Sequence, residues 1–377
     1  GGTLGRCLTL LAPPLAAQCR SMQDGPAGAA LQCADGAACS GSSSERRTSP
    51  GSFRLVQYNV RGLTAADGSS AVGTVASSLR SLQAAVVCLN EVDLRRQPEG
   101  LDQLAEASGT PHVHFFGHVA GRYGNALLSR FPIRQVRDIH LEGGTEVEWP
   151  PNSGLKRRIR RGLLAATLVL PVDRGPRAAP EPSASASPAA QPSGPGPQLQ
   201  EPRDQEEVLL TVFCTHLDHM DEGQRMVQMT HALGEMRSDG IPHLLVGDLN
   251  ALDANDYSAT EWAALEQKAA ESGWVSPSDA TCVRLLLREG YVDAFRARTS
   301  VDGPLPVGSA KFTAHTTRPM YRIDYALLSP AALASGLRVR GAFVETAAEG
   351  SDHFPLVVDF DWEGAEDARL PGLSSKL

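Results

Sequence analysis

The chain has 377 residues, of which 42% are hydrophobic and 21% are charged, values typical of a globular protein that can bury a substantial core. Its formal net charge of −8 gives no general attraction to polyanions, so contact with nucleic acid would require a local basic groove. No apolar run reaches the length of about 18 residues that a membrane-spanning helix needs, so we expect none.

The N-terminal segment, residues 1–52, is rich in Ala, Gly and Ser and shows neither helical nor strand periodicity. We expect it to be a disordered tail outside the core. Because it has several arginines and few acids, it is also compatible with a transit segment for a chloroplast or mitochondrion. The seven cysteines include no CxxC pair, which favours a reducing, intracellular setting. If the tail does not direct the protein to an organelle, we expect it in the cytoplasm.

Short apolar runs of strand length then recur along the chain. In order, they cover residues 55–58, 85–89, 126–129, 163–170, 208–215, 243–247, 325–329 and 355–360. Helical patterns cover residues 72–83, 222–237 and 260–270, and Ser258 with Glu261 predicts a capping box at the start of the third. Many strands and few helices favour two stacked sheets with helices outside, an α/β or α+β sandwich.

A Pro/Ala/Ser-rich stretch at about 171–205 interrupts this pattern and contains little that could pack into a core. Because apolar strand-like runs lie directly on both sides of it, we interpret it as an enlarged, disordered hairpin loop. The sequence therefore predicts one domain over residues 53–362, with a C-terminal tail at 363–377, and we expect a monomer.

Polar side chains stand where the predicted strands end. Asn59, Glu91, His216 and Asp248 each follow an apolar run, and Asn250 comes two residues after Asp248. Taken singly, such residues usually cap helices or form turns. Strand ends on one edge of a sheet converge, however, so the ordered set predicts a functional site on a rigid scaffold.

The segments that carry these residues resemble the successive motifs of the endonuclease/exonuclease/phosphatase family. They are FRLVQYNVRGL, VVCLNEVD, YGNALLSRFPI, CTHLDH, LLVGDLNA, RIDYALLS and SDHFPLV, in the family's order over residues 53 to 360. The resemblance implies a four-layer, deoxyribonuclease I-like sandwich of two mainly antiparallel β-sheets flanked by helices. It also implies a hydrolase of phosphate esters that depends on Mg²⁺, with Mn²⁺ as an alternative.

Carried over by position, the resemblance implies a metal site and a histidine–carboxylate pair. Glu91 would be the main metal ligand and Asn59 would support the metal or a bound water, as expected for a hard cation. Asp352 would hold a second cation or orient its neighbours. His353 would act near the scissile phosphate, held by Asp324, which would fix its tautomer and raise its pKa.

The same resemblance assigns the remaining site residues. Asp248 would orient or deprotonate the attacking water, and Asn250 and His216 would donate hydrogen bonds to the phosphate oxygens. Asn125 would contact the substrate phosphate. Arg161 is expected to do so as well, because it directly precedes an apolar strand.

Three functions remain open from the sequence. The basic run at residues 156–161, KRRIRR, could line a groove for a nucleic-acid backbone. This favours a Mg²⁺-dependent phosphodiesterase that acts on nucleic acid. The start of a solvent-exposed strand would have the same composition. The second hypothesis is a phosphatase or phospholipase for lipid head-group or small-molecule phosphates. The third is a non-catalytic scaffold, which the complete set of site residues disfavours.

Overall fold

The structure is a computed structural model that describes residues 51–148, 153–172, 206–272, 277, 280–298, 305 and 308–362. The predicted N-terminal tail up to residue 50, the insertion from residue 173 and the C-terminal tail lie outside the described residues. Within the described part, no helix is both long and apolar enough to cross a membrane.

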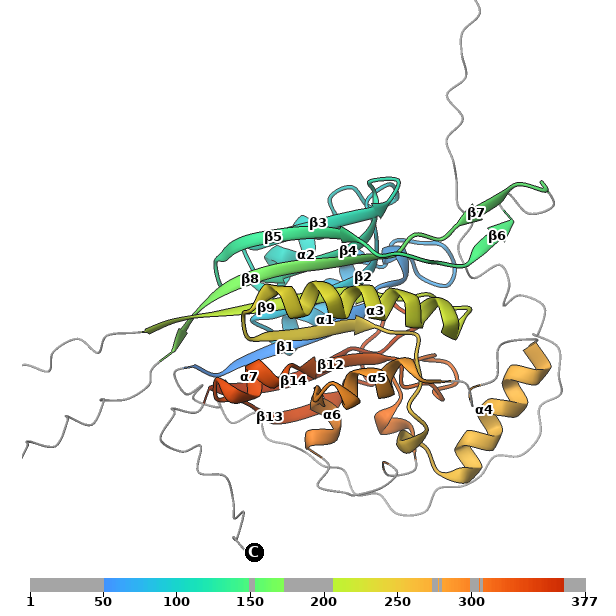
Figure 1. The fold of residues 1–377 in the computed structure, drawn as a ribbon. Helices are drawn as coiled ribbons and strands as arrows, with labels where there is room; N and C mark the ends of the chain where they lie inside the picture. The colour runs from blue at the N-terminus through green and yellow to red at the C-terminus, as the bar shows by residue number, and fades with distance from the viewer. Residues whose placement is uncertain are drawn as a thin grey trace, which may run out of the picture. The chain divides into compact units, whose positions relative to one another are not determined.

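The main unit contains two six-stranded sheets (Figure 1). The first has the order β13-β14-β1-β2-β4-β3, formed by Leu337–Val344, Leu356–Trp362, Phe53–Asn59, Val86–Asp93, Tyr123–Ser129 and His112–Val119. The second has the order β11-β12-β10-β9-β8-β5, formed by Val292–Asp293, Asp324–Leu328, His243–Asp248, Glu206–His216, Gly162–Val172 and Ile133–His140. Residues 146–157 form a separate unit, and β6 (Glu146–Glu148) pairs with β7 (Lys156–Arg158) in a two-stranded sheet.

Each six-stranded sheet contains one parallel pair of strands among antiparallel neighbours. In the first sheet β1 runs parallel to β2, and in the second β9 runs parallel to β10. A helix connects each pair, α1 (Val72–Leu82) in the first and α3 (Glu222–Asp239) in the second. All the other pairings are antiparallel, so the sheets are mainly antiparallel, as predicted.

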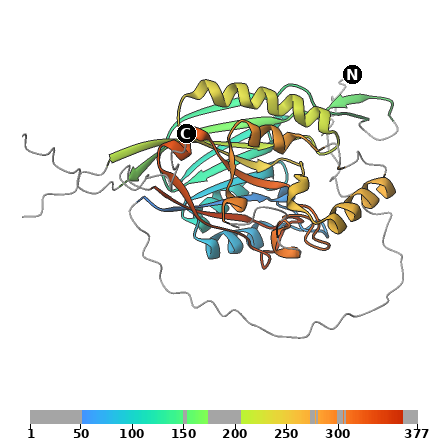
Figure 2. The same cartoon turned by 60° about the horizontal axis from the view of Figure 1, so that its bottom comes forward.

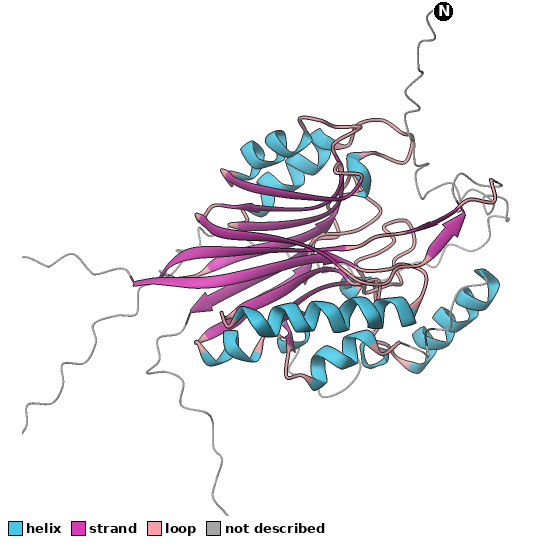
Figure 3. Cartoon of the chain, turned by 45° about the horizontal axis from the view of Figure 1, so that its top comes forward, coloured by secondary structure: helices cyan, strands magenta, loops and turns pink. Residues whose placement is uncertain are grey.

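Helices cover the outer face of both sheets and complete the four predicted layers (Figures 2 and 3). α1 and α2 (Gly100–Ser108) pack against the first sheet, and α3 and α5 (Cys282–Arg288) pack against the second. A third apolar cluster fills the space between the two sheets. The remaining helices are α4 (Ala259–Ser272), α6 (Ala294–Ala297) and α7 (Pro330–Ala334).

The central strands are apolar on both faces because both faces are covered. Along β1, Leu55 faces the core between the sheets while its neighbour Val56 faces α1 and α2. All eight predicted apolar runs lie in strands to within one residue at their ends, and the three predicted helices are present. The capping box is confirmed, since Ser258 N donates to Glu261 Oε2 at 2.8 Å and Glu261 N donates to Ser258 Oγ at 3.3 Å.

Candidate active site

The carboxyl ends of the two parallel strand pairs face each other at one edge of the sandwich. Asn59 ends β1, and His216 and Asp248 end β9 and β10, where they are register partners. Asp324 begins β12 and pairs with Asp248 across the antiparallel ladder. The topology therefore gathers residues that are far apart in the sequence.

A β-bulge in β2 sends two adjacent side chains to different places. The register of β2 against β4 shifts between Leu89 and Val92, and Glu91 has a φ of 60°, in the left-handed region. Asn90 is fully buried between the sheets, while the Glu91 side chain is 18% exposed and reaches Asn59. The bulge is thus what presents Glu91 to the site.

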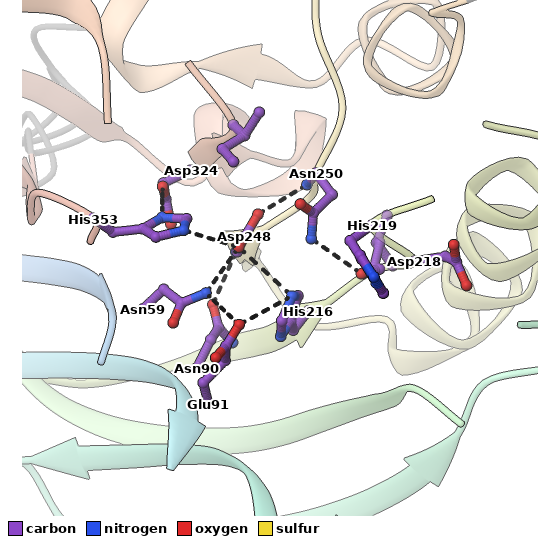
Figure 4. A network of polar contacts seen from close by, with 12 residues as sticks. Asn59, Asn90, Glu91, His216, Asp218, His219, Asp248, Asn250, Asp324 and His353 are labelled. Carbon is purple, nitrogen blue, oxygen red and sulfur yellow. Dashed lines mark hydrogen bonds and ion pairs between the residues drawn. The ribbon is translucent and has the colours of Figure 1, made fainter. Parts of the chain in front are cut away.

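Three nitrogen atoms converge on one carboxylate oxygen, Asp248 Oδ2 (Figure 4). Asn59 Nδ2 lies 2.9 Å from it, His216 Nε2 lies 3.6 Å from it and His353 Nε2 lies 3.8 Å from it. Asn59 Nδ2 also donates to Glu91 Oε1 at 3.1 Å, so it bridges the two carboxylates. Because the Asn59 oxygen accepts from Arg61 N, it is the amide nitrogen that faces Glu91. In this arrangement Asn59 orients Glu91 through its amide nitrogen, and its oxygen is directed to Arg61 N.

The predicted pairing of His353 with Asp324 is present, with Nδ1 and Oδ2 2.8 Å apart. Burial alone would lower the pKa of His353, but the charge of Asp324, the hydrogen bond to it and the charge of Asp248 raise that pKa to about 10. His353 is therefore a cation at neutral pH, with Nε2–H directed toward Asp248.

Asp248 differs from an ordinary surface carboxylate in its burial and in its raised pKa. Its side chain is 1% exposed, and burial, followed by the charge of Asp324, raises its pKa to about 7. A carboxylate with a pKa near neutrality can accept a proton and return it at the working pH. The site thus combines a proton acceptor with a neighbouring imidazolium.

Arg161 fixes the tautomer of two further histidines. Its guanidinium contacts His216 Nδ1 at 3.1 Å and His219 Nδ1 at 3.2 Å. Because a guanidinium can only donate, both Nδ1 atoms accept and each ring carries its proton on Nε2. Burial and then the Arg161 charge hold the pKa of His216 well below its usual value, so His216 is a neutral donor facing the site.

A buried polar network behind the site was missed from the sequence. Gln57 Nε2 donates to Asn90 Oδ1 at 2.6 Å and lies 3.3 Å from Asp324 Oδ1. Asn90 in turn accepts from the backbone of Asp248 at 2.8 Å and donates to the Thr215 carbonyl at 3.0 Å. Both amides lie inside apolar strands, where sequence reasoning assigned only packing, and together they fix the strand ends that carry the site.

Asn125 belongs to this network and is not presented to substrate. It is fully buried; its oxygen accepts from Asn90 at 3.0 Å and its nitrogen donates to the Gly162 carbonyl at 3.0 Å. A phosphate contact would require it to give up one of these bonds. The expected role of Asn125 at the substrate phosphate therefore does not fit this geometry, because the register of β4 turns its side chain between the sheets.

Asn250 and Asp352 lie beside the centre with their groups already engaged. The strand ends at Asp248, and Asn250 has a φ of 47°, with its side-chain nitrogen donating to the Leu217 carbonyl at 3.2 Å. Asp352 lies 3.7 Å from the Arg61 guanidinium, which compensates part of its charge, and 3.8 Å from His315, whose pKa burial lowers. This environment does not suit the second-cation role expected for Asp352.

The donor chemistry around Glu91 fits a hard divalent cation. Within the described residues, the Glu91 carboxylate lies 3.1 Å from Asn59 Nδ2 and 4.0 Å from the neutral His216 ring, and it shares a side-chain hydrogen bond with Tyr123. None of these groups neutralises its charge. A second grouping, Asp248, Asp324 and His353, has ligand atoms within 4.8 Å of one another. There the imidazole is bonded to Asp324 and positively charged, so Glu91 is the better anchor for a metal.

Comparison with known proteins agrees with this architecture. The model of the endonuclease/exonuclease/phosphatase family matches residues 56–353. A family protein from Bacteroides thetaiotaomicron shares the fold at 15% identity and a TM-score of 0.52, over 84% of this chain and 99% of that one.

Two further solved structures show the same fold. A family protein from Bacteroides vulgatus has a TM-score of 0.51 at 15% identity, over 83% of this chain and 99% of that one. The catalytic domain of human nocturnin, with a bound sulfate, has a TM-score of 0.50 at 17% identity, over 83% of this chain and 94% of that one. Among curated proteins no sequence matches. The chain belongs to the endonuclease/exonuclease/phosphatase family and is a phosphate-ester hydrolase by that membership.

Proposed function

We propose that this protein is a Mg²⁺-dependent phosphodiesterase and that nucleic acid is its substrate. The observation that carries the proposal is the convergence of Asn59, His216 and His353 on Asp248 Oδ2, all within 4 Å. Such a cluster of donors around one proton acceptor suits an anionic substrate whose charge changes during the reaction.

Each residue then has a distinct task in hydrolysis. Asp248 orients a water and takes its proton while the water oxygen forms the new bond to phosphorus. The ester P–O bond breaks, and its electron pair leaves with the departing oxygen. The His353 cation and the neutral His216 donor stabilise charge on the phosphoryl oxygens, and Asp324 keeps His353 charged and oriented.

Glu91 would hold the divalent cation, with water or substrate oxygens completing its coordination. When bound, Mg²⁺, or Mn²⁺ in its place, would neutralise phosphate charge and act as a Lewis acid. Asn59 supports this from the protein side, because its amide nitrogen holds the Glu91 carboxylate in place.

The preference for nucleic acid rests on the basic run at 156–161, which contains five Lys or Arg residues in a chain of net charge −8. A local cationic surface is what a phosphate backbone requires of an otherwise acidic protein. Lipid head-group and small-molecule phosphates form the alternative substrate class.

The test is cleavage of end-labelled DNA and RNA oligonucleotides by the full chain in Mg²⁺ or in EDTA. We expect Mg²⁺-dependent cutting by the wild type that is abolished in His353→Ala and Asp248→Asn. Arg80→Gln, an exposed substitution on α1, is the matched control and should cut normally. Folded wild-type protein that hydrolyses no phosphate ester would refute the proposal. Activity only on head-group or small phosphates would replace its substrate class.

A further inference from the structure

A pocket of about 430 Å³ opens at the end of β5, outside the catalytic cluster. It is lined by His140, Leu141, Glu142, Gly143, Arg158 and Arg160. Leu141 is buried, and the charged side chains are exposed. The lining contains two guanidinium groups and one carboxylate, so it is positively charged in a chain whose total charge is −8.

The pocket lies on the same edge of the second sheet as the active site. His140, the last residue of β5, pairs with Gly162 at the start of β8, and Leu163 of β8 pairs with Thr215, the residue before His216. Neighbouring strands are about 4.8 Å apart, so two strand spacings place the pocket roughly 10 Å from His216. A substrate can span this distance with a second charged group a few bonds beyond the scissile phosphate.

Adjacent residues connect the two sites. Arg161 is buried and directs its guanidinium to His216, whereas Arg160 is exposed and lines the pocket. Their side chains diverge from one short backbone segment, which is held by the bond from Leu141 N to Arg161 O at 3.0 Å. A group bound at Arg160 would therefore lie at a fixed distance from a phosphate bound at His216.

The turn that contains Gly143, another lining residue, is also fixed. Gly143 and Gly144 have φ values of 79° and 112°, and a Cβ on Gly144 would lie 2.1 Å from the Ile159 carbonyl. Gly144 N donates to Gln224 Oε1 at 2.7 Å, which ties the turn to α3. The cavity is thus formed partly by backbone that hydrogen bonds hold in place, and not by surface side chains alone.

We infer that this pocket binds a second phosphate group of the substrate, separate from the one that is hydrolysed. Arginine guanidinium groups form paired, charge-assisted hydrogen bonds with phosphate, and the His140 ring adds a further donor. The inference rests on the proposed function and narrows it to substrates that carry at least two phosphates, whether along a polynucleotide or on a small molecule.

The test compares four phosphodiesters with the full chain in Mg²⁺. They are a thymidine dinucleotide without a terminal phosphate, the same dinucleotide with a 5′-phosphate or a 3′-phosphate, and a small base-free diester that carries a phosphomonoester. The wild type should prefer one terminally phosphorylated dinucleotide by about tenfold in kcat/KM, as expected for one hydrogen bond between charged groups. Arg160→Gln and Arg158→Gln should reduce that preference, and Arg80→Gln should retain it.

The outcomes separate the two proposals. Equal hydrolysis of all the dinucleotides by the wild type, or a preference that survives Arg160→Gln, would overturn the pocket inference and leave the proposed function standing. Hydrolysis of none of the four diesters would overturn the pocket inference, and the oligonucleotide assay would decide the proposed function separately. Preference for the base-free bisphosphate over the dinucleotides would retain the second-phosphate pocket and assign it to small-molecule substrates.

Discussion

Replacing Arg161 by Met tests whether the protonation of His216 matters for turnover. Arg161 is 4% exposed, and its guanidinium contacts the Nδ1 atoms of His216 and His219. Met fills a similar elongated space without donating a hydrogen bond. Without the cation, His216 is no longer held with its proton on Nε2, and its pKa is released from the lowering that the Arg161 charge causes.

The expected loss follows from what His216 does in the site. Its Nε2–H lies 3.6 Å from Asp248 Oδ2, in place to donate to a phosphoryl oxygen. Removing one such preorganised donor costs on the order of 10²–10³ in kcat, or about 2.7–4 kcal/mol. Because Arg161 acts through His216, we expect the loss mainly in kcat. A direct phosphate contact would instead raise KM and change the salt dependence.

The assay is steady-state hydrolysis of bis(4-nitrophenyl) phosphate in Mg²⁺ over a range of pH and salt, with urea unfolding as a check on folding. Arg54→Met is the control. It removes a partly buried arginine that bonds Asp359 at 2.6 Å at the start of β1, the opposite end of the strand from Asn59. An unchanged kcat in Arg161→Met, or an equal loss in the control, would refute the reasoning.

Three further predictions concern the metal, the buried network and acid stability. Glu91→Gln removes the charge that anchors the cation, so the Mg²⁺ concentration for half-maximal activity, measured by metal titration, should rise by about tenfold or more. An unchanged Mg²⁺ requirement would rule Glu91 out as the metal ligand. Asn90→Ala leaves the Asp248 N–H and the Thr215 carbonyl without their partner, so the free energy of unfolding in urea should fall by roughly 2–6 kcal/mol, and a loss below about 1 would contradict the network. Burial, and then the Arg161 charge, lower the pKa of His118 to about 3, so the unfolded chain binds a proton below about pH 6.5 that the native chain does not. The stability from this ring is thus present above that pH and is lost on acidification, by about 2 kcal/mol between pH 7 and pH 5. His118→Gln should lose less stability over that interval, and an identical loss in both proteins would show that the ring titrates normally.

Among the strands, the sequence predicted those that are buried on both faces. Such strands are continuous apolar runs, and β1, β10 and β12 were found for that reason. The edge strand β5 has no fully buried residue and contains several charges, so its pattern resembles a loop. Short helices such as α6, with four residues, span too little chain to show a period.

For the site, chain order was enough to identify the residues at strand ends, since any polar residue that closes a buried strand lies on the rim of the sheet. It placed Glu91 at the site but did not show why, because a bulge in β2 turns Glu91 toward the site and Asn90 between the sheets. It also assigned Asn125 to the substrate, because a motif does not show toward which layer a side chain points.

Amino-acid sequence alone determined the fold class, the family and the residues at the strand ends, because these depend on local patterns and on motif order. Tertiary structure alone decided the chemical state of those residues. Burial and then the charge of Asp324 make Asp248 a proton acceptor, and the charge of Asp324, its hydrogen bond and the charge of Asp248 make His353 a cation. Protonation depends on burial and on charges a few ångströms away, and the neighbours that supply them come together only when both sheets have formed.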